Sequence, residues 1–360
     1  MTYYSKKISR LRSTLKCVGD LLSQASDDIK DVAGVIGVVE ERMVYDENVK
    51  TFNSTKRLVD LVDQVMAQGV KRCSKRSETG TVCTGVPTGY CTFDEYTGGL
   101  QSSDFIIIAG RPAMGKTAFA LNVAMRASGV YSVPTAIFSL EMTKEQLMQR
   151  MLCSWGKVDF SRFRRGYLDD SDWAMLREAA DALSSAPLFV DHTVALTTME
   201  LRSRCRRLKA EHGLGLVVVD YLQLMRSWGR HDSRELELSN ISFNLKELAK
   251  ELDVPVIALS QLSSKVEERG DKRPMISDLP DESSAIERDA DVIIFLYREA
   301  AYKQKDELTP EDNVAEVIIG KQRNGPNGTV YLRFFKESAS FENLQDIASP
   351  LGQEGASSGG

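Results

Sequence analysis

One glycine-flanked loop carries the residues best suited to chemistry, Gly110-x-x-x-x-Gly115-Lys116-Thr117. The apolar run 105–109 precedes it, and the helix-like segment 118–126 follows it. Glycines at both ends let the backbone curl with its N–H groups pointing inward, and the helix adds its positive N-terminal dipole. In such a loop the lysine reaches the β- and γ-phosphates of a nucleotide, and the threonine hydroxyl binds Mg²⁺.

A tight turn with two chance glycines would show the same spacing. Here, however, strand, loop and helix follow one another in the required order, so we predict a site for a nucleoside triphosphate with Mg²⁺. The residues expected to bind the nucleotide line the loop and the start of the helix: Gly110, Arg111, Pro112, Ala113, Met114, Gly115, Lys116, Thr117 and Ala118.

Three polar side chains follow other β-rich runs of the chain, namely Glu141, Asp220 and Gln261. In a parallel sheet, ligands bind outside the carboxyl ends of the strands, so all three are expected at the edge where the phosphate loop lies. Asp220 suits the acid that holds Mg²⁺, together with Thr117 and through a bound water. The alternative for Asp220 is a helix N-cap after a buried strand.

Glu141 suits the group that orients and deprotonates the water attacking the γ-phosphate. Its alternative is a first-turn helix acid that the helix dipole favours, with Thr143 opening the helix. Gln261 suits a hydrogen bond to the γ-phosphate or to that water, which would report hydrolysis to the segment after it. Its alternative is a strand-end amide bonded to the backbone.

Two cations, Lys321 and Arg323, stand two positions apart where a predicted hairpin begins, so both side chains leave the same face of the strand. No acidic residue is adjacent to them in the sequence. They therefore suit a developing negative charge, as does an arginine that reaches a nucleotide from outside its site. The alternative is an ordinary solvated hairpin tip.

The elements that must position these residues alternate between short β-rich runs and helical patterns. This alternation is typical of an α/β fold with a mostly parallel sheet covered by helices on both faces. The turn-rich segment 320–329 joins the last two runs as an antiparallel hairpin. The predicted strands span residues 105–109, 135–140, 188–190, 216–219, 256–260, 292–297, 315–319 and 330–335.

The chain has 360 residues, 42% of them hydrophobic, with a formal net charge of -5. Such a composition is ample for a buried core and argues against a uniformly basic coat for nucleic acid, although local patches can still bind it. The six cysteines form no Cys-x-x-Cys pair and the three histidines lie far apart, which argues against a zinc site or disulfides. With no apolar signal core and no run long enough to span a bilayer, cytoplasmic localisation without membrane contact is expected.

Three regions are expected along the chain. Residues 1–79 form a helical segment with an amphipathic helix around 58–65 and a polar linker from 73, residues 80–345 form the core domain, and the low-complexity end 346–360 is a disordered tail.

Basic residues cluster in three places. The helix 199–212 carries five, but they spread around it, so a solvated face without a site role is expected. Two glycine-containing loops, 226–234 and 267–274, follow the Asp220 and Gln261 strands and are candidates for gripping phosphates of DNA. The candidate DNA-binding residues in them are Arg234, Arg269, Lys272 and Arg273.

Together these residues resemble those of DnaB-type replicative helicases, which are hexameric ring motors with a RecA-like ATPase domain. The resemblance runs from about residue 85 to residue 341. In order, the matching motifs are Gly85-Val-Pro-Thr-Gly-Tyr, Gly110-Arg-Pro-Ala-Met-Gly-Lys-Thr-Ala-Phe-Ala-Leu-Asn, Phe138-Ser-Leu-Glu-Met, Asp220-Tyr-Leu-Gln-Leu-Met, Val256-Ile-Ala-Leu-Ser-Gln-Leu-Ser, Ile286-Glu-Arg-Asp-Ala-Asp and Lys321-Gln-Arg-Asn-Gly-Pro.

The resemblance implies the roles argued above for Lys116, Thr117, Glu141, Asp220 and Gln261. It further implies that Lys321 and Arg323 act on the nucleotide of the adjacent subunit, which makes the active site composite. By the same resemblance, Arg150 touches the nucleotide phosphates.

The chain departs from the family pattern in two places. The channel loop that usually reads Arg-Glu-Ser-Gly is here Pro280-Asp281-Glu282-Ser283-Ser284, which has lost the arginine and the glycine. Glu282 and Ser283 occupy its candidate DNA-binding positions, with Arg269, Lys272 or Arg273 compensating. Only about 80 residues precede the motor, so most of the N-terminal collar domain of the family is expected to be missing from this sequence.

We therefore expect an ATP-dependent DNA helicase that works with Mg²⁺ as a homo-hexamer on single-stranded DNA, with a primase or a helicase loader as candidate partners. Two alternatives remain open at this point. One is a RecA-like recombinase or recombination mediator that forms filaments, and the other is a nucleotide-binding assembly factor that does not unwind DNA.

Overall fold

The computed structural model describes residues 83–227, 233–280, 284–303 and 309–344, together with Val62 and Met66, which are helical. The chain divides into two compact units, Met1–Glu78 and Thr79–Gly360. The predicted amphipathic helix is described only at these two positions. The linker, the tail, Glu282 and Ser283 lie outside the described residues.

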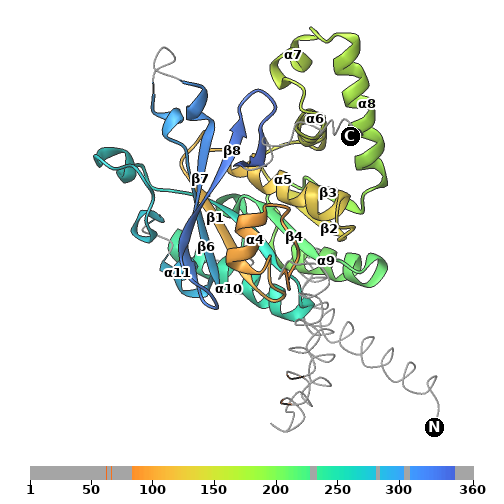
Figure 1. The fold of residues 1–360 in the computed structure, drawn as a ribbon. Helices are drawn as coiled ribbons and strands as arrows, with labels where there is room; N and C mark the ends of the chain where they lie inside the picture. Colours follow the sequence, from red (N-terminus) through yellow and green to blue (C-terminus); the bar gives the residue numbers. More distant parts are fainter. Residues whose placement is uncertain are drawn as a thin grey trace, which may run out of the picture. The chain divides into compact units, whose positions relative to one another are not determined.

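A nine-stranded sheet forms the centre of the described part of the chain, in the order β3-β2-β4-β5-β1-β6-β7-β8-β9. The six strands from β3 to β6 in this order run parallel, and β7, β8 and β9 continue the sheet antiparallel (Figure 1). The strands are β1 Phe105–Gly110, β2 Thr135–Ser139, β3 Leu188–Asp191, β4 Leu216–Asp220, β5 Val256–Gln261, β6 Val292–Tyr297, β7 Val314–Gln322, β8 Gly328–Phe335 and β9 Ser340–Asn343.

The predicted strands are confirmed, with small changes at their ends. The central strands β1, β4 and β6 are buried along their whole length, which explains why they read as continuous apolar runs rather than as alternating ones. By contrast, β7 alternates between buried and half-buried residues, because it belongs to the antiparallel part of the sheet.

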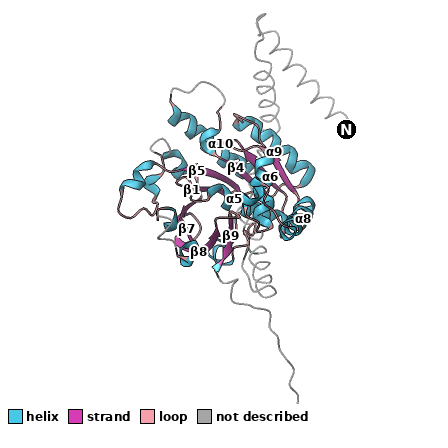
Figure 2. Ribbon diagram, turned by 90° about the horizontal axis from the view of Figure 1, so that it is seen from above, coloured by secondary structure: helices cyan, strands magenta, loops and turns pink. Residues whose placement is uncertain are grey.

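Helices cover both faces of the sheet, and the alternation of side chains along each strand divides the core into two clusters. On one face Ile106 and Ile108 of β1 pack with α5, and on the other face Phe105 and Ile107 pack with α10. Figures 1 and 2 show the helices on either side of the sheet. The helices are α4 Cys91–Thr97, α5 Lys116–Gly129, α6 Lys144–Trp155, α7 Phe160–Arg165, α8 Asp170–Ser185, α9 Thr198–His212, α10 Arg234–Leu252 and α11 Ser284–Asp289.

The last strand, β9, was not predicted. It is only four residues long, and one of its side chains, Phe341, is completely buried. The ring of Phe341 meets Phe119 of α5 edge-on, with 5.3 Å between the centroids, and the Asn122 carboxamide accepts a hydrogen bond of 2.9 Å from the Phe341 backbone N–H. The sheet therefore extends to β9, which packs against α5, the helix that follows the phosphate loop.

The basic helix predicted at 199–212 is α9, with Leu201 and Cys205 buried against the sheet. Its cations form ion pairs at the surface, such as those of Arg202 with Glu251 and of Arg204 with Asp191. This arrangement agrees with a solvated face. Within the described residues, no helix has the length and apolar character to cross a membrane.

Candidate nucleoside triphosphate site

The phosphate loop connects β1 to α5, in the order that the sequence predicts. Gly115 has a φ of 96° and caps α5, and Ala113 has a φ of 66°, so two residues of the loop adopt the left-handed conformation that lets the backbone curl. A Cβ atom at Gly115 would lie 3.1 Å from Phe341 Cζ. The glycine is therefore required by its conformation and by close packing.

Lys116 folds back over the loop. Its Nζ donates hydrogen bonds to the carbonyl oxygens of Gly110 (2.7 Å) and Arg111 (3.1 Å). Burial lowers the pKa of Lys116 to about 8, while the carboxylates of Asp220 and Glu141 act in the opposite direction. The ammonium group thus lies among loop carbonyls with two carboxylates nearby, where a phosphate would relieve its loss of hydration.

Asp220 ends β4 and lies beside Ser139, the last residue of β2. Only 4% of its surface is exposed, Thr117 donates a hydrogen bond to its carboxylate, and its Oδ2 has no hydrogen-bond partner among the described residues. A helix N-cap would accept from backbone N–H groups, and the short 3₁₀ helix that follows has Tyr221 as its N-cap, so this alternative is not supported.

The environment of Asp220 suits a divalent cation. Burial raises the pKa of Asp220 to about 6 and the Glu141 carboxylate adds to the rise, whereas Thr117, Lys116 and Arg150 oppose it. No group of three His, Cys, Asp or Glu residues that could hold a metal occurs in the described ranges. A magnesium ion at Thr117 and Asp220 would therefore complete its coordination with water and substrate phosphates, as this ion usually does.

The buried carboxylate of Asp220 is expected to make stability depend on pH. Its pKa is higher in the folded chain than the ordinary 3.8, so the nucleotide-free fold loses stability as the pH rises from 3.8, and the loss is complete above pH 6. Asp220→Asn should leave the free energy of unfolding unchanged at about pH 3 and raise it by ~3 kcal/mol at about pH 7. Urea unfolding of both proteins without Mg²⁺ or nucleotide at the two pH values measures this difference.

Asp169→Asn is the matched control, because its expected effect on the free energy of unfolding has the opposite sign. Hydrogen bonds from Ser171, Asp172 and Arg162 hold the pKa of Asp169 below its usual range. Removal of that carboxylate should therefore lower stability, and the loss should fade as the pH falls from the ordinary pKa of aspartate toward the lowered pKa of Asp169. If Asp220→Asn followed the Asp169→Asn trend, the carboxylate of Asp220 would be better solvated or better paired than the structure indicates.

Glu141 lies two residues after the end of β2 and is exposed. The next helix, α6, has Thr143 as its N-cap in a capping box with Gln146, and its first-turn acid is Glu145. The alternative that Glu141 is a first-turn acid is therefore wrong. Glu141 makes no hydrogen bond or ion pair with another described residue, yet it lies close enough to raise the pKa of Asp220.

Gln261 is the last residue of β5 and pairs in register with Gly110, the first residue of the phosphate loop. Its side chain is exposed and makes no hydrogen bond within the described ranges, so the alternative of a backbone-bonded amide is not supported. The segment after it is tied to the same loop: Arg111 donates to the Leu262 carbonyl (2.9 Å) and pairs with Glu267 (2.8 Å). The parallel register thus places the amide at the mouth of the site.

Two arginines also approach this edge. Arg150, on α6, lies over the Phe160 ring at 5.7 Å, and its charge helps to lower the pKa of Asp220. Arg298 was not predicted, although it directly follows β6 just as the predicted residues follow their strands. It is 8% exposed, its Nη1 donates to the Ala113 carbonyl (3.2 Å), its guanidinium lies 4.0 Å from the Phe334 ring, and burial lowers its pKa to about 10.

Lys321 and Arg323 lie at the opposite end of the sheet. Lys321 pairs with Ile293 near the start of β6, and Arg323 N donates to the Asp291 carbonyl (3.0 Å). Asp291 N in turn donates to the carbonyl of Phe105, at the start of β1. The length of β1, at about 3.3 Å per residue, separates that point from the phosphate loop, so both cations are roughly 17 Å from the site in their own chain.

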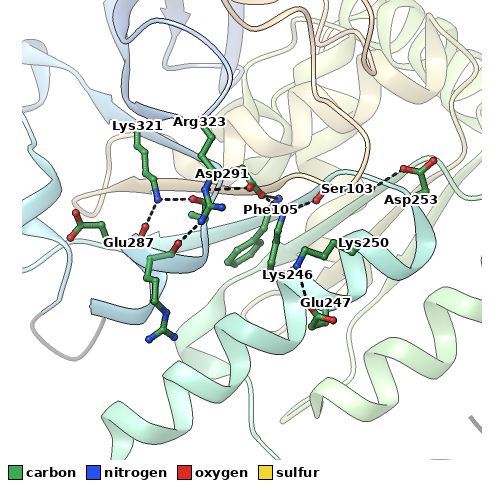
Figure 3. Close-up of polar contacts among 12 residues, drawn as sticks. Ser103, Phe105, Lys246, Glu247, Lys250, Asp253, Glu287, Asp291, Lys321 and Arg323 are labelled. Carbon is green, nitrogen blue, oxygen red and sulfur yellow. Dashed lines mark hydrogen bonds and ion pairs between the residues drawn. The ribbon is translucent and has the colours of Figure 1, made fainter. Parts of the chain in front are cut away.

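An acidic partner does lie near these cations in space. Arg323 Nε is 3.5 Å from Asp291 Oδ1, so the expectation of no adjacent acid holds along the sequence but is wrong in the fold. Figure 3 shows Lys321 and Arg323 extending side by side toward the end of α11, as the shared strand face predicts.

The described candidates for DNA contact are paired inside the chain. Each of the three arginines has an acidic partner and the lysine lies over an aromatic ring: Arg269 with Asp278 (2.8 Å), Arg273 with Glu316 (2.8 Å), Arg234 with Glu237, and Lys272 over Tyr302 (4.6 Å). The charges of the three arginines are therefore partly neutralised, and contact of these arginines with DNA would require their ion pairs to be shared or exchanged.

Comparison with known proteins adds to this geometry. The family described as "DnaB-like helicase C terminal domain" matches residues 85–343. The replicative DNA helicase DnaC of Bacillus subtilis (strain 168) is 45% identical over 329 residues, which are 91% of this chain and 68% of that protein. The replicative DNA helicase DnaB of Geobacillus stearothermophilus is 51% identical over 263 residues, 73% of this chain and 57% of the relative. The chain thus spans only part of the length of these proteins.

Two solved structures are similar to this chain. One is an ATPase domain, which superposes with a TM-score of 0.72 at 39% identity, covering 79% of this chain and 99% of the other. The second is a DnaB-like replicative helicase, solved in a study of its interactions with primase, which gives a TM-score of 0.71 at 34% identity, covering 95% of this chain and 77% of the other. The RecA-like α/β fold with a mostly parallel sheet is therefore confirmed.

Proposed function

Since the chain belongs to the family of DnaB-like helicases, we propose that it is an ATP-dependent DNA helicase motor that moves along single-stranded DNA as a homo-hexameric ring. One observation carries this proposal. The phosphate loop, the carboxylate of Asp220 with its unpaired oxygen, and the exposed Glu141 converge on one edge of the sheet.

The proposed reaction is the in-line attack of water on the γ-phosphate of ATP. Lys116 stabilises the phosphate charge, Glu141 orients the water and takes its proton, and Gln261 contacts the γ-phosphate or that water. Mg²⁺, held by Thr117 and Asp220, would supply further charge neutralisation when bound. The main-chain N–H groups of the loop and the positive end of α5 bind the remaining phosphate oxygens, with Arg150 as a further phosphate contact.

The proposed ring follows from the position of the two cations. Lys321 and Arg323 lie too far from their own phosphate loop to touch its nucleotide, and they stand on the surface where a neighbour can be reached. In a head-to-tail ring each subunit would present them to the triphosphate of the next one. Gln261 would then sense hydrolysis. The segment after it, which Arg111 contacts, would pass the change on to the loops that bind DNA.

The proposed partners are single-stranded DNA and other copies of this chain, with a primase or helicase loader as a further partner. The candidate DNA contacts remain those named from the sequence, including Glu282 and Ser283 outside the described residues. The proposed compartment is the cytoplasm, either of a bacterium or of the host cell if a virus encodes the chain.

Two measurements on the full chain test this proposal: ATP hydrolysis with and without single-stranded DNA, and strand displacement on a forked duplex. We expect Mg²⁺-dependent hydrolysis that DNA stimulates, together with strand separation. Hydrolysis without DNA stimulation or displacement would favour the nucleotide-binding assembly factor. Filaments on DNA instead of closed rings in electron micrographs would favour the recombinase.

A further inference from the structure

A buried carboxylate, Asp291, lies at the end of the sheet opposite the phosphate loop. It stands between α11 and β6 and is 5% exposed. Its Oδ2 accepts a hydrogen bond from the Phe105 backbone N–H (2.8 Å) and forms an ion pair with Lys246 Nζ (2.5 Å) from α10 (Figure 3). One oxygen of this carboxylate is therefore fixed by the start of β1 and by the half-buried cation of Lys246.

The other oxygen of Asp291 faces the proposed catalytic cation. Arg323 Nε lies 3.5 Å from Oδ1, and the Arg323 backbone N–H donates to the Asp291 carbonyl oxygen (3.0 Å). The guanidinium also donates through Nη2 to the Arg288 carbonyl (2.6 Å). Lys321 Nζ is held nearby by the carbonyls of Ala290 (2.8 Å) and Glu287.

The contacts at the two carboxylate oxygens of Asp291 differ in strength, and this difference suits a group that orients the Arg323 guanidinium. The contacts at Oδ2 are short and buried, whereas the 3.5 Å between Nε and Oδ1 exceeds the length of a charge-assisted hydrogen bond, and the Arg323 side chain is 47% exposed. The carboxylate is thus held firmly at Oδ2, while the exposed guanidinium is bound through Nη2 to the Arg288 carbonyl and contacts Oδ1 only loosely. A fixed negative charge beside Arg323 restricts the orientations of its guanidinium, and the side chain stays at the surface.

We infer that Asp291 is a positioning residue for Arg323: it holds the base of the arginine through the backbone and orients its guanidinium for the nucleotide of the neighbouring subunit. This inference rests on the proposed function, in which Arg323 acts in trans. Asp291 is also bound to the first residue of β1, the strand that leads into the phosphate loop of the same chain. It therefore connects the phosphate loop of one active site with the arginine that serves the neighbouring site.

Asp291→Asn is the direct test, because asparagine retains an acceptor for the Phe105 N–H but loses the charge that faces Arg323. A misoriented reacting group typically costs about a hundredfold in rate, so we expect kcat for ATP hydrolysis to fall about tenfold to a hundredfold. KM for ATP should change little, since the phosphate loop of the variant is intact. Asp289→Asn is the matched control: that carboxylate pairs with Arg288 in the same segment and forms no ion pair with Arg323 within the described residues.

Mixing distinguishes positioning from damage to the variant's own site. In rings assembled from Asp291→Asn and Glu141→Gln chains, some interfaces combine the intact Glu141 of the first with the correctly held Arg323 of the second. We expect turnover to recover well above the value of either variant alone. If Asp291 instead supported the phosphate loop of its own chain through β1, the mixture would stay inactive and the inference would be overturned.

A parallel mixture separates this inference from the proposed function. Arg323→Ala mixed with Glu141→Gln should also recover turnover. Recovery there without recovery for Asp291→Asn overturns the role of Asp291 alone, whereas failure of both mixtures overturns the composite site itself.

A second variant is available in case Asp291→Asn does not fold, which thermal unfolding and binding of a fluorescent ATP analogue would reveal. Lys246→Gln keeps the carboxylate but removes the cation that fixes Oδ2. We expect a smaller loss, about threefold to tenfold in kcat, with KM for ATP little changed. An unchanged kcat in a folded Lys246→Gln protein would contradict the requirement for a fixed carboxylate.

Discussion

Glu141→Gln is expected to lower kcat for ATP hydrolysis by about a hundredfold to ten-thousandfold, the usual contribution of a general base. Glutamine has the same shape but cannot accept the proton of the attacking water. Binding of ATP should remain, because Glu141 makes no hydrogen bond or ion pair with another described residue and its loss leaves the phosphate loop unchanged. Steady-state phosphate release gives kcat, and equilibrium binding of a fluorescent ATP analogue gives the affinity.

The control for this variant is Glu145→Gln. Glu145 is an exposed acid in the first turn of α6, which is the position that the alternative reading assigned to Glu141. We expect kcat within about twofold of the original protein, because surface substitutions of this kind have small effects. Equal losses in the two variants would mean that the general electrostatics of this edge, and not a base at Glu141, supports hydrolysis.

Arg323→Ala is expected to lower kcat even further, by about 10³-fold to 10⁵-fold, the range known for an arginine that completes a nucleotide site in trans. Its affinity for an ATP analogue should change much less, since the arginine lies roughly 17 Å from the phosphate loop of its own chain. Single-turnover hydrolysis by the assembled ring, with ring size checked by light scattering, measures the chemical step directly.

Mixing Arg323→Ala with Glu141→Gln tests whether the arginine acts across subunits. In a random equimolar ring about a quarter of the interfaces combine an intact Glu141 with an intact Arg323, so partial recovery of turnover is expected. Arg207→Ala on α9 serves as the control for loss of an exposed arginine, because its partner there is Glu211 in the same helix. Absence of recovery in assembled mixed rings would count against the trans arrangement.

Much of the site could be predicted because its signals are local. Each parallel strand contributes whatever follows its carboxyl end to the same edge, so Glu141, Asp220 and Gln261 could be expected at the edge where the phosphate loop lies. Local apolar runs also indicated eight of the nine strands. The central strands β1, β4 and β6 are buried on both faces and read as continuous hydrophobic segments.

Other features depend on contacts between distant parts of the chain. The four-residue strand β9 has no pattern of its own and exists because Phe341 packs on Phe119 and Asn122 holds its backbone. Arg298 reaches the phosphate loop only because β6 lies next to β1. The register of Gly110 against Gln261, and hence the short path between loop and amide, also could not be read from either segment alone.

Neighbouring residues specify a strand, a glycine-flanked turn and a helix, and so the amino-acid order was enough to predict the chemical groups proposed to act on a triphosphate. The place of the second set of cations depends instead on the folded arrangement. The antiparallel return of β7 carries Lys321 and Arg323 to the start of β6, at the end of the sheet away from the phosphate loop, and burial of Asp291 beside Lys246 gives that arginine its carboxylate neighbour. The physical reason is that the pairing of charges across a sheet follows from strand order and register, which arise from packing between segments far apart in the chain.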